Sequence, residues 1–218
     1  KAVGLDWRRD PHRIVDVIGE LEADIVVLQE ADKRLGQRPG VLPLDRLKKE
    51  HGYVLAKVDS GGQSHGWHGN AILYRESEIP KPLTDRIPLP AREPRGAIFA
   101  AFEQLGFAVI GAHLALTAGI RRAQIKTLCT HAGQFDAPTI IAGDFNHWPH
   151  HLPAGQNEVV TPGLSFHASR QIAALDRFIL CGGVDARDSY VHTSLKARQA
   201  SDHLPVVLDA ELAKGKEL

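Results

Sequence analysis

The stretch Ile140-Ile141-Ala142-Gly143-Asp144-Phe145-Asn146 is typical of a buried strand that ends in polar side chains. The apolar residues 139–142 form the strand, and Gly143 allows the chain to turn. Because alternate side chains of extended backbone share a face, Asp144 and Asn146 point the same way and Phe145 points back to the core. A carboxylate beside a carboxamide suits the handling of a water or of a metal-bound phosphate. A polar turn is the alternative that this stretch alone leaves open.

Polar residues of a similar kind end, flank or interrupt the other apolar strands. They are Glu30, Asn70, His113, Asp176, Asp202 and His203. A carboxylate within an apolar strand, such as Asp176, is costly unless it is paired, and histidine is the obvious partner. Each residue has a structural explanation when it is taken singly. Together they indicate a site, because ligands and catalytic groups gather at strand ends.

The composition is that of an ordinary globular protein, with 43% hydrophobic and 24% charged residues. Lys plus Arg and Asp plus Glu both number 26, which argues against a broad, non-specific nucleic-acid surface. No apolar run is long enough to span a membrane. Cys129 and Cys181 lie in apolar contexts and are interpreted as buried free thiols. We therefore predict a cytoplasmic protein, although an export signal upstream of Lys1 would not be visible.

Helical periodicity and capping signals predict three helices, at residues 10–24, 44–51 and 117–134. Apolar runs predict strands at 25–28, 53–58, 70–74, 96–103, 107–112, 139–142, 164–166, 174–180 and 206–212. Residues 80–94 contain five prolines, which indicates an irregular connection or an edge strand. No linker or repeat divides residues 1–218. The pattern favours one α/β domain in which two mixed sheets pack face to face with helices outside.

Several motifs occur in an order that resembles one known family. They are Leu28-Gln29-Glu30, Gly69-Asn70-Ala71, Gly111-Ala112-His113-Leu114, Gly143-Asp144-Phe145-Asn146, Leu175-Asp176-Arg177 and Ser201-Asp202-His203. In this order the chain resembles the endonuclease/exonuclease/phosphatase superfamily, which includes deoxyribonuclease I, over nearly its whole length. The resemblance implies a four-layer α/β sandwich and the Mg²⁺-dependent cleavage of phosphate esters.

The resemblance also implies a role for each motif residue. Asp144 orients or deprotonates the attacking water, with Asn146 beside it. His203 contacts the phosphate, Asp176 orients its ring, and His113 is a second histidine on the phosphate side. Glu30 is a metal ligand, and Asp202 lies near the metal. These are oxygen ligands, which suit Mg²⁺ or Mn²⁺ better than zinc.

Substrate contacts are expected from Asn70 and from Arg95, with Arg92 as the competing cationic clamp. Trp67 and Trp148 are expected to shape the pocket, where an indole could stack on a base or cover an acyl or sugar group. The substrate is a phosphate ester, and nucleic acid, a phospholipid and a small phosphoester all remain open. No obligate protein partner is evident.

One departure concerns the first strand of the family, which ends in an asparagine that helps to bind the metal. No such strand precedes Lys1, and the chain contains no Met. We expect that the domain lacks its first strand in this sequence. The alternative is a degenerate metal site in a non-catalytic phosphate- or nucleotide-binding module. A third hypothesis is a zinc site formed by His147, His150 and His151.

Overall fold

A computed structural model describes residues 3–33, 38–59, 62–91 and 95–213. Its largest sheet has six strands in the order β4-β5-β6-β7-β9-β8. Their bounds are Leu83–Pro88 (β4), Gly96–Phe102 (β5), Phe107–His113 (β6), Thr139–Asp144 (β7), Asp176–Cys181 (β9) and Glu158–Val160 (β8). The sheet is mixed, since β6 and β7 pair in parallel and the other neighbours are antiparallel. Helix α3 (Ala118–Gln134) is the crossover that the parallel pair requires.

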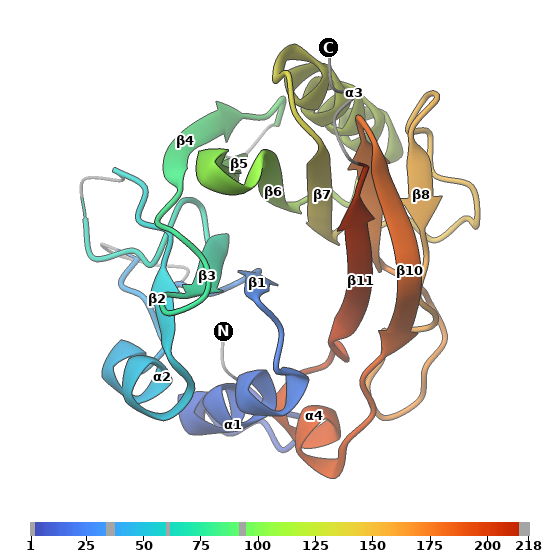
Figure 1. Ribbon diagram of the computed structural model, residues 1–218. Helices are drawn as coiled ribbons and strands as arrows, with labels where there is room; N and C mark the ends of the chain where they lie inside the picture. The colour runs from blue at the N-terminus through green and yellow to red at the C-terminus, as the bar shows by residue number, and fades with distance from the viewer. Residues whose placement is uncertain (1–2, 34–37, 60–61, 92–94, 214–218) are drawn as a thin grey trace.

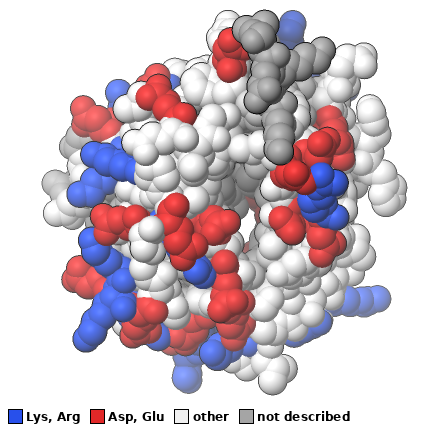
Figure 2. All heavy atoms as spheres, viewed as in Figure 1, with Lys and Arg blue, Asp and Glu red and all other residues white. Residues whose placement is uncertain are grey.

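Two smaller antiparallel sheets form the second layer of strands. One has the order β1-β3-β2, with bounds Ile25–Leu28 (β1), Ala71–Arg75 (β3) and Tyr53–Leu55 (β2). The other is the hairpin of β10 (Val184–Val191) and β11 (Val206–Leu212). Both pack on the six-stranded sheet, β1 and β3 against β7 and β5, and the hairpin against β9 (Figure 1). Figure 2 shows a recess between the two small sheets, with acidic residues at its border and mixed charges around it.

Helices complete the outer layers. The helix α3 covers the outer face of the six-stranded sheet, while α1 (Pro11–Leu21) and α2 (Leu44–His51) cover the three-stranded sheet (Figure 1). A short helix, α4 (Leu195–Ala200), packs beside α1. Strand β5 is buried on both faces, because Phe99 faces the α3 side and Ile98 and Phe102 face β3. The expected four-layer α/β architecture is confirmed.

Most expected elements are present, with shifted ends. The expected strand at 53–58 is shorter, and the one at 164–166 is reduced to isolated bridges through Phe166. Strand β1 packs on both faces, with Val26 and Leu28 toward the helices and Ile25 and Val27 toward the large sheet, but only Val26 is fully buried. Its position at the edge of the sheet explains the incomplete burial, because apolar composition does not reveal how many neighbouring strands cover a strand.

Three elements were not expected from the sequence, namely β8, β10 and α4. In β10 the pairing with β11 shifts between Ala186 and Asp188, which marks a bulge. A bulge adds one residue and so breaks the alternation by which a half-buried strand is recognised. Helix α4 has only six residues, and its clearest signal is Ser194, whose side chain accepts a hydrogen bond from the backbone N–H of Ala197.

In the part of the chain that the structure describes, no helix has both the length and the apolarity to cross a membrane. Both cysteines are free, Cys181 being buried and Cys129 half-buried, as their apolar contexts predicted.

Candidate active site

Strand pairing brings three of the expected residues together. In the register of the large sheet, His113 on β6 is opposite Asp144 on β7, and Asp144 is opposite Asp176 on β9. Gly143 allows this close approach, since a Cβ at that position would lie 1.9 Å from the carbonyl oxygen of Ala112. The strand therefore continues through Gly143 and Asp144, and the turn expected at the glycine comes later.

The turn occurs at Asn146, whose φ of 49° lies in the left-handed region that asparagine tolerates. Its backbone N–H donates to Asp144 Oδ1 at 2.8 Å, and its Nδ2 donates to the carbonyl of Leu114 at 2.9 Å. Phe145 is fully buried in the core beneath α3, as the alternation predicted. Asp144 and Asn146 are thus fixed side by side at the end of β7.

Burial gives Asp144 and His113 unusual proton affinities. Burial, together with the negative charge of Asp176, raises the pKa of Asp144 to about 7. Burial, followed by the positive charge of Arg95, lowers the pKa of His113 to about 4. His113 Nε2 lies 3.3 Å from Asp144 Oδ2. This contact is therefore not an ion pair at neutral pH, because the imidazole is uncharged there.

His203 is paired with Asp176 across the site. Its Nδ1–H donates to Asp176 Oδ2 at 2.8 Å, and the Oγ of the fully buried Ser165 donates to the same oxygen at 2.5 Å. Burial alone would lower the pKa of His203, but the hydrogen bond and the charges of Asp176 and Asp144 raise it to about 9. Ser165 was not expected, since a serine in a loop carries no distinguishing sequence signal.

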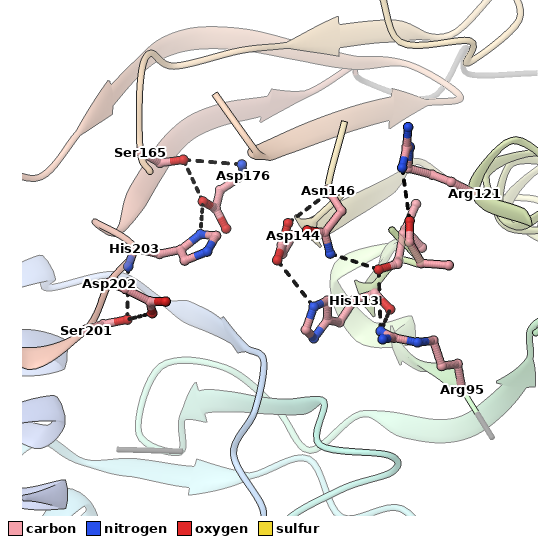
Figure 3. Close-up of polar contacts among 12 residues, drawn as sticks. Arg95, His113, Arg121, Asp144, Asn146, Ser165, Asp176, Ser201, Asp202 and His203 are labelled. Carbon is pink, nitrogen blue, oxygen red and sulfur yellow. Dashed lines mark hydrogen bonds and ion pairs between the residues drawn. The ribbon is translucent and has the colours of Figure 1, made fainter. Parts of the chain in front are cut away.

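Figure 3 shows the imidazoles of His113 and His203 pointing into one space, with the Asp144 carboxylate at its edge. His203 comes from the segment before β11, and His113 and Asp144 come from the large sheet. The arrangement places a proton acceptor and a cationic donor on the same space. Such a pair can accept a proton from water while it stabilises negative charge.

The two histidines should titrate far apart in the metal-free protein. His203 stays protonated until the pH rises to about 9, and His113 stays neutral until the pH falls to about 4, so at pH 7 only His203 carries charge. Nitrogen-15 NMR of the two rings across pH 4 to 10 measures this directly. Titration of both rings near pH 6.5, the ordinary value, would contradict the electrostatics described here.

Glu30 follows β1 with a φ of 55°, a strained conformation for a residue that is not glycine. The backbone of Gly69 packs against it, and the N–H of Ala31 donates to the Gly69 carbonyl at 2.8 Å. The negative charge of Glu30 adds to the burial that raises the pKa of Asp144, and it partly opposes the burial that lowers the pKa of His113. These effects place Glu30 within electrostatic reach of the site.

The remaining expected residues lie around this centre. Asp202 is exposed, and in Figure 3 its carboxylate turns toward Ser201 rather than toward Asp176. Asn70 is buried, its Nδ2 donates to the carbonyl of Gly96 at 2.8 Å, and its Oδ1 makes no hydrogen bond within the described residues. The amide thus ties β3 to β5 and presents an acceptor, where phosphate binding would require a donor.

Arg95 lies beside His113, where its Nη1 donates to the carbonyls of His113 and Leu114 at 3.3 and 3.4 Å. It therefore lies next to the site, in a position that fits the expected cationic clamp. The competing Arg92 lies outside the described residues.

Two buried residues of α3 support the loop after His113, and neither was expected. Gln124 Oε1 accepts from the N–H of Ala115 at 2.8 Å, and Arg121 Nη1 donates to the carbonyls of Ala115 and Leu116 at 3.1 and 2.8 Å. Asn146 holds the preceding residue through the Leu114 carbonyl. Polar residues on the inner face of a helix were the available signal, because a buried polar side chain needs a partner.

The histidine-rich loop after Asn146 does not form the zinc site considered above. His147 instead accepts from Arg121 Nε at 3.3 Å and donates through Nε2 to the carbonyl of His151 at 2.7 Å. Within the described residues, no three side chains of His, Cys, Asp or Glu are grouped to hold a metal. The loop is organised by hydrogen bonds.

Comparison with known proteins places these features in one family. A sequence profile described as the endonuclease/exonuclease/phosphatase family matches residues 2–203. No curated protein matches the chain. Among solved structures, an endonuclease/exonuclease/phosphatase from Beutenbergia cavernae DSM 12333 is 22% identical, with a TM-score of 0.69 over 97% of this chain and 69% of that one.

Two further solved structures are named for a function or a bound product. D. rerio TDP2 complexed with single strand DNA product is 18% identical, with a TM-score of 0.67 over 92% of this chain and 91% of that one. The mannosyl-6-phosphatase Bt3783 of Bacteroides thetaiotaomicron VPI-5482 is 16% identical, with a TM-score of 0.62 over 91% and 89%. At these identities the likeness concerns the fold.

Proposed function

Because the chain belongs to the endonuclease/exonuclease/phosphatase family, we propose that it is a Mg²⁺-dependent phosphoesterase that hydrolyses phosphodiester bonds. Members of this family are phosphoesterase hydrolases and are typically dependent on a divalent metal. One observation carries the proposal for this chain. A buried carboxyl group with a pKa of about 7 and an imidazole with a pKa of about 9 face the same space from opposite sides.

In the proposed reaction, Asp144 takes a proton from the attacking water. A general base works best when its pKa lies near the working pH, which the raised pKa of Asp144 provides. The N–H of Asn146 holds one carboxylate oxygen, so the carboxylate is oriented before water arrives. His203 donates a hydrogen bond from its protonated ring to a phosphate oxygen, where charge grows as the water adds. The phosphorus–oxygen bond to the leaving group breaks as the bond to water forms, and the alcohol that leaves takes up a proton from solvent.

His113 has a different part in the proposal. It is neutral at the working pH and lies 3.3 Å from Asp144, so it orients that carboxylate without neutralising it. Asp176 and Ser165 set the ring of His203 through the shared oxygen. The two halves of the site are thus held by separate hydrogen-bond networks, one for the water and one for the phosphate.

A divalent cation fits the chemistry of this site. Burial is the largest cause of the raised pKa of Asp144, and the negative charges of Asp176 and Glu30 add to it, so three carboxylates act on one another in this pocket. Glu30 and Asp202 are the residues that would hold Mg²⁺ or Mn²⁺, both being oxygen donors. When bound, the metal would neutralise phosphate charge. The Oδ1 of Asn70, which accepts no hydrogen bond within the described residues, is a further buried oxygen, and Gly69 before it packs on the backbone of Glu30.

The substrate class is proposed from the charge of the site and of the whole chain. The structural neighbours include one complexed with a single strand DNA product and one named a phosphatase of a phosphorylated sugar. We favour a diester, because a phosphate with one fewer charge is better accommodated by a site that already holds several carboxylates. Zero net charge favours a small or single-stranded substrate over non-specific binding of duplex DNA.

A substrate panel tests the proposal. The protein is incubated with Mg²⁺ and with single-stranded DNA, abasic DNA, dinucleotides, phospholipids, inositol phosphates and sugar phosphates. Hydrolysis of at least one ester is expected, with its loss on chelation and its return when Mg²⁺ is added back. Hydrolysis of none, together with retained binding of phosphate esters, would refute catalysis and favour the non-catalytic module. Full activity in excess chelator would refute the metal requirement.

Glu30→Gln should weaken the response to metal more than it weakens the chemistry. The substitution keeps the shape of the side chain and removes its negative charge, so the Mg²⁺ concentration for half-maximal activity should rise about 10- to 100-fold. Activity at saturating Mg²⁺ should recover most of its original value. The measurement is a Mg²⁺ titration of the initial rate, with Glu76→Gln on the protein surface as the matched control. An unchanged Mg²⁺ requirement would remove Glu30 from the metal site.

A further inference from the structure

An exposed indole lies at the edge of the site. The side chain of Trp148 follows Asn146 by two residues and remains 57% exposed. Its ring packs edge-on against Phe166, with centroids 6.3 Å apart, and Phe166 in turn lies 4.9 Å from the ring of His203. Backbone pairing also joins Phe166 to His203. Three rings are therefore in contact in the order His203, Phe166 and Trp148, and the last of them is exposed to solvent.

The loop that carries Trp148 is irregular, but it is held rigidly. The guanidinium of Arg177, only 1% exposed, donates to the carbonyls of His147, Pro149 and His150 at 2.9, 2.8 and 3.2 Å. It also donates to the carbonyl of Ala174, two residues before β9 begins, at 2.9 Å. Burial lowers the pKa of Arg177, which is the cost of placing a charge here. These bonds clamp the backbone on both sides of Trp148.

The strand β9 links this clamp to the catalytic pair. Successive side chains of a strand point to opposite faces, so Asp176 reaches His203 while Arg177 reaches the loop. Two adjacent residues, Asp176 and Arg177, thus fix the positions of the His203 ring and of the loop that carries the Trp148 indole. Because the buried Arg177 holds the backbone of this loop, the exposed ring of Trp148 starts from a fixed backbone position, as a binding surface requires.

We propose that Trp148 is a stacking platform for an aromatic group joined to the scissile phosphate, namely a nucleobase, and that Arg177 positions it. The inference rests on the proposed function, since it requires the phosphate at His203. A flat, preorganised ring loses little entropy when a second ring stacks on it. Phe166 contacts both rings, so a single aromatic ring separates the indole from His203, and the sugar between a phosphate and its base would span that interval.

The surroundings favour a base over an acyl chain. The indole has both kinds of neighbour, because its ring packs against Phe166 while His150 and His151 are exposed on the same loop. A base offers an apolar face to the indole and polar edges to such neighbours, whereas an acyl chain requires apolar walls on several sides. Trp148 should therefore favour substrates that carry a nucleobase over substrates that carry an acyl chain.

Matched dinucleotides test the platform through catalysis. One is a thymidine dinucleotide, and two are the same molecule with either base replaced by hydrogen. In Mg²⁺, Trp148→Ala should lower kcat/KM about 10- to 100-fold on the complete dinucleotide, which is the usual worth of one stacked base. It should have less than about a twofold effect on the analogue that lacks the stacked base. Trp148→Phe should retain most of the wild-type kcat/KM. The control is Trp7→Ala, because Trp7 is another exposed tryptophan, with 91% of its side chain accessible.

Binding provides a readout that does not depend on turnover. Calorimetry with thymidine 5′-monophosphate and with 2-deoxyribose 5-phosphate should show that Trp148→Ala weakens only the first. Equal loss for both ligands, or for neither, overturns the inference. If the wild type hydrolyses other esters but no dinucleotide, the platform is wrong and the proposed function stands. If nothing is hydrolysed but the nucleotide binds through Trp148, the platform stands and the proposed function fails.

Discussion

Replacing Asp144 with asparagine should lower kcat about 10³-fold, which is within the range for the loss of a general base. The amide oxygen of asparagine can still accept the hydrogen bond from the N–H of Asn146, so the geometry at the end of β7 should survive. What disappears is the capacity to take a proton from water. The rate is measured as initial hydrolysis in saturating Mg²⁺, with Asp188→Asn on the exposed strand β10 as control.

The same substitution should make the protein more stable, with a dependence on pH that identifies the cause. A carboxyl group whose pKa rises on folding, here from 3.8 to about 7, costs stability that grows from about pH 4 and is complete above pH 7. Removing the charge should therefore raise the Tm by several degrees at pH 8 and by less at pH 5. A gain in stability together with a loss of activity is the stability–activity trade-off that is expected when a catalytic group is removed.

Two results would oppose this account of Asp144. Wild-type activity in Asp144→Asn would show that another group accepts the proton. A lost activity together with a lowered Tm at pH 8 would indicate that the carboxylate supports the fold, because removing a destabilising buried charge cannot lower stability. Circular dichroism of both proteins before the assay separates these outcomes from simple misfolding.

The sequence was informative where function depends on short local motifs. Glu30, His113, Asp144 and Asp176 end or begin strands, and their positions follow from apolar runs that fix where each strand stops. Sheet register then brings His113, Asp144 and Asp176 into line, so predicting the strands nearly predicts this part of the site. The same holds for the four layers, since the three longer helices and most strands have recognisable local patterns.

The supporting contacts were not predictable in the same way. Ser165, Arg177 and Gln124 act on backbone atoms or side chains that are distant in sequence, and only tertiary packing makes those partners available. Arg177 shows the limit most clearly. Its neighbour in sequence is the carboxylate of Asp176, yet its donors go to main-chain carbonyls, most of them in the loop around Trp148. An arginine buried without a carboxylate leaves no pattern in the chain.

His203→Gln should lower kcat about 10²- to 10³-fold, the usual loss when one donor to developing phosphate charge is removed. Glutamine can keep a hydrogen bond to Asp176 but carries no positive charge. The wild-type rate should fall as the pH rises through about 9, where His203 loses its proton, and this limb should be absent in the variant. The pH profile of kcat in saturating Mg²⁺ from pH 6 to 10 provides the measurement.

A second histidine–carboxylate pair in the molecule serves as the control for this prediction. His192 Nε2 lies 3.0 Å from Glu20 Oε2, in a pair that joins the segment before α4 to α1. His192→Gln removes the same chemical group from a contact of similar length and burial, so it should leave both the rate and the high-pH limb unchanged. If both variants lose activity alike, the effect of His203 is structural. If only His203→Gln loses the rate and the limb together, the charge on that ring acts on the phosphate, because a merely structural pair has no reason to set the pH at which hydrolysis declines.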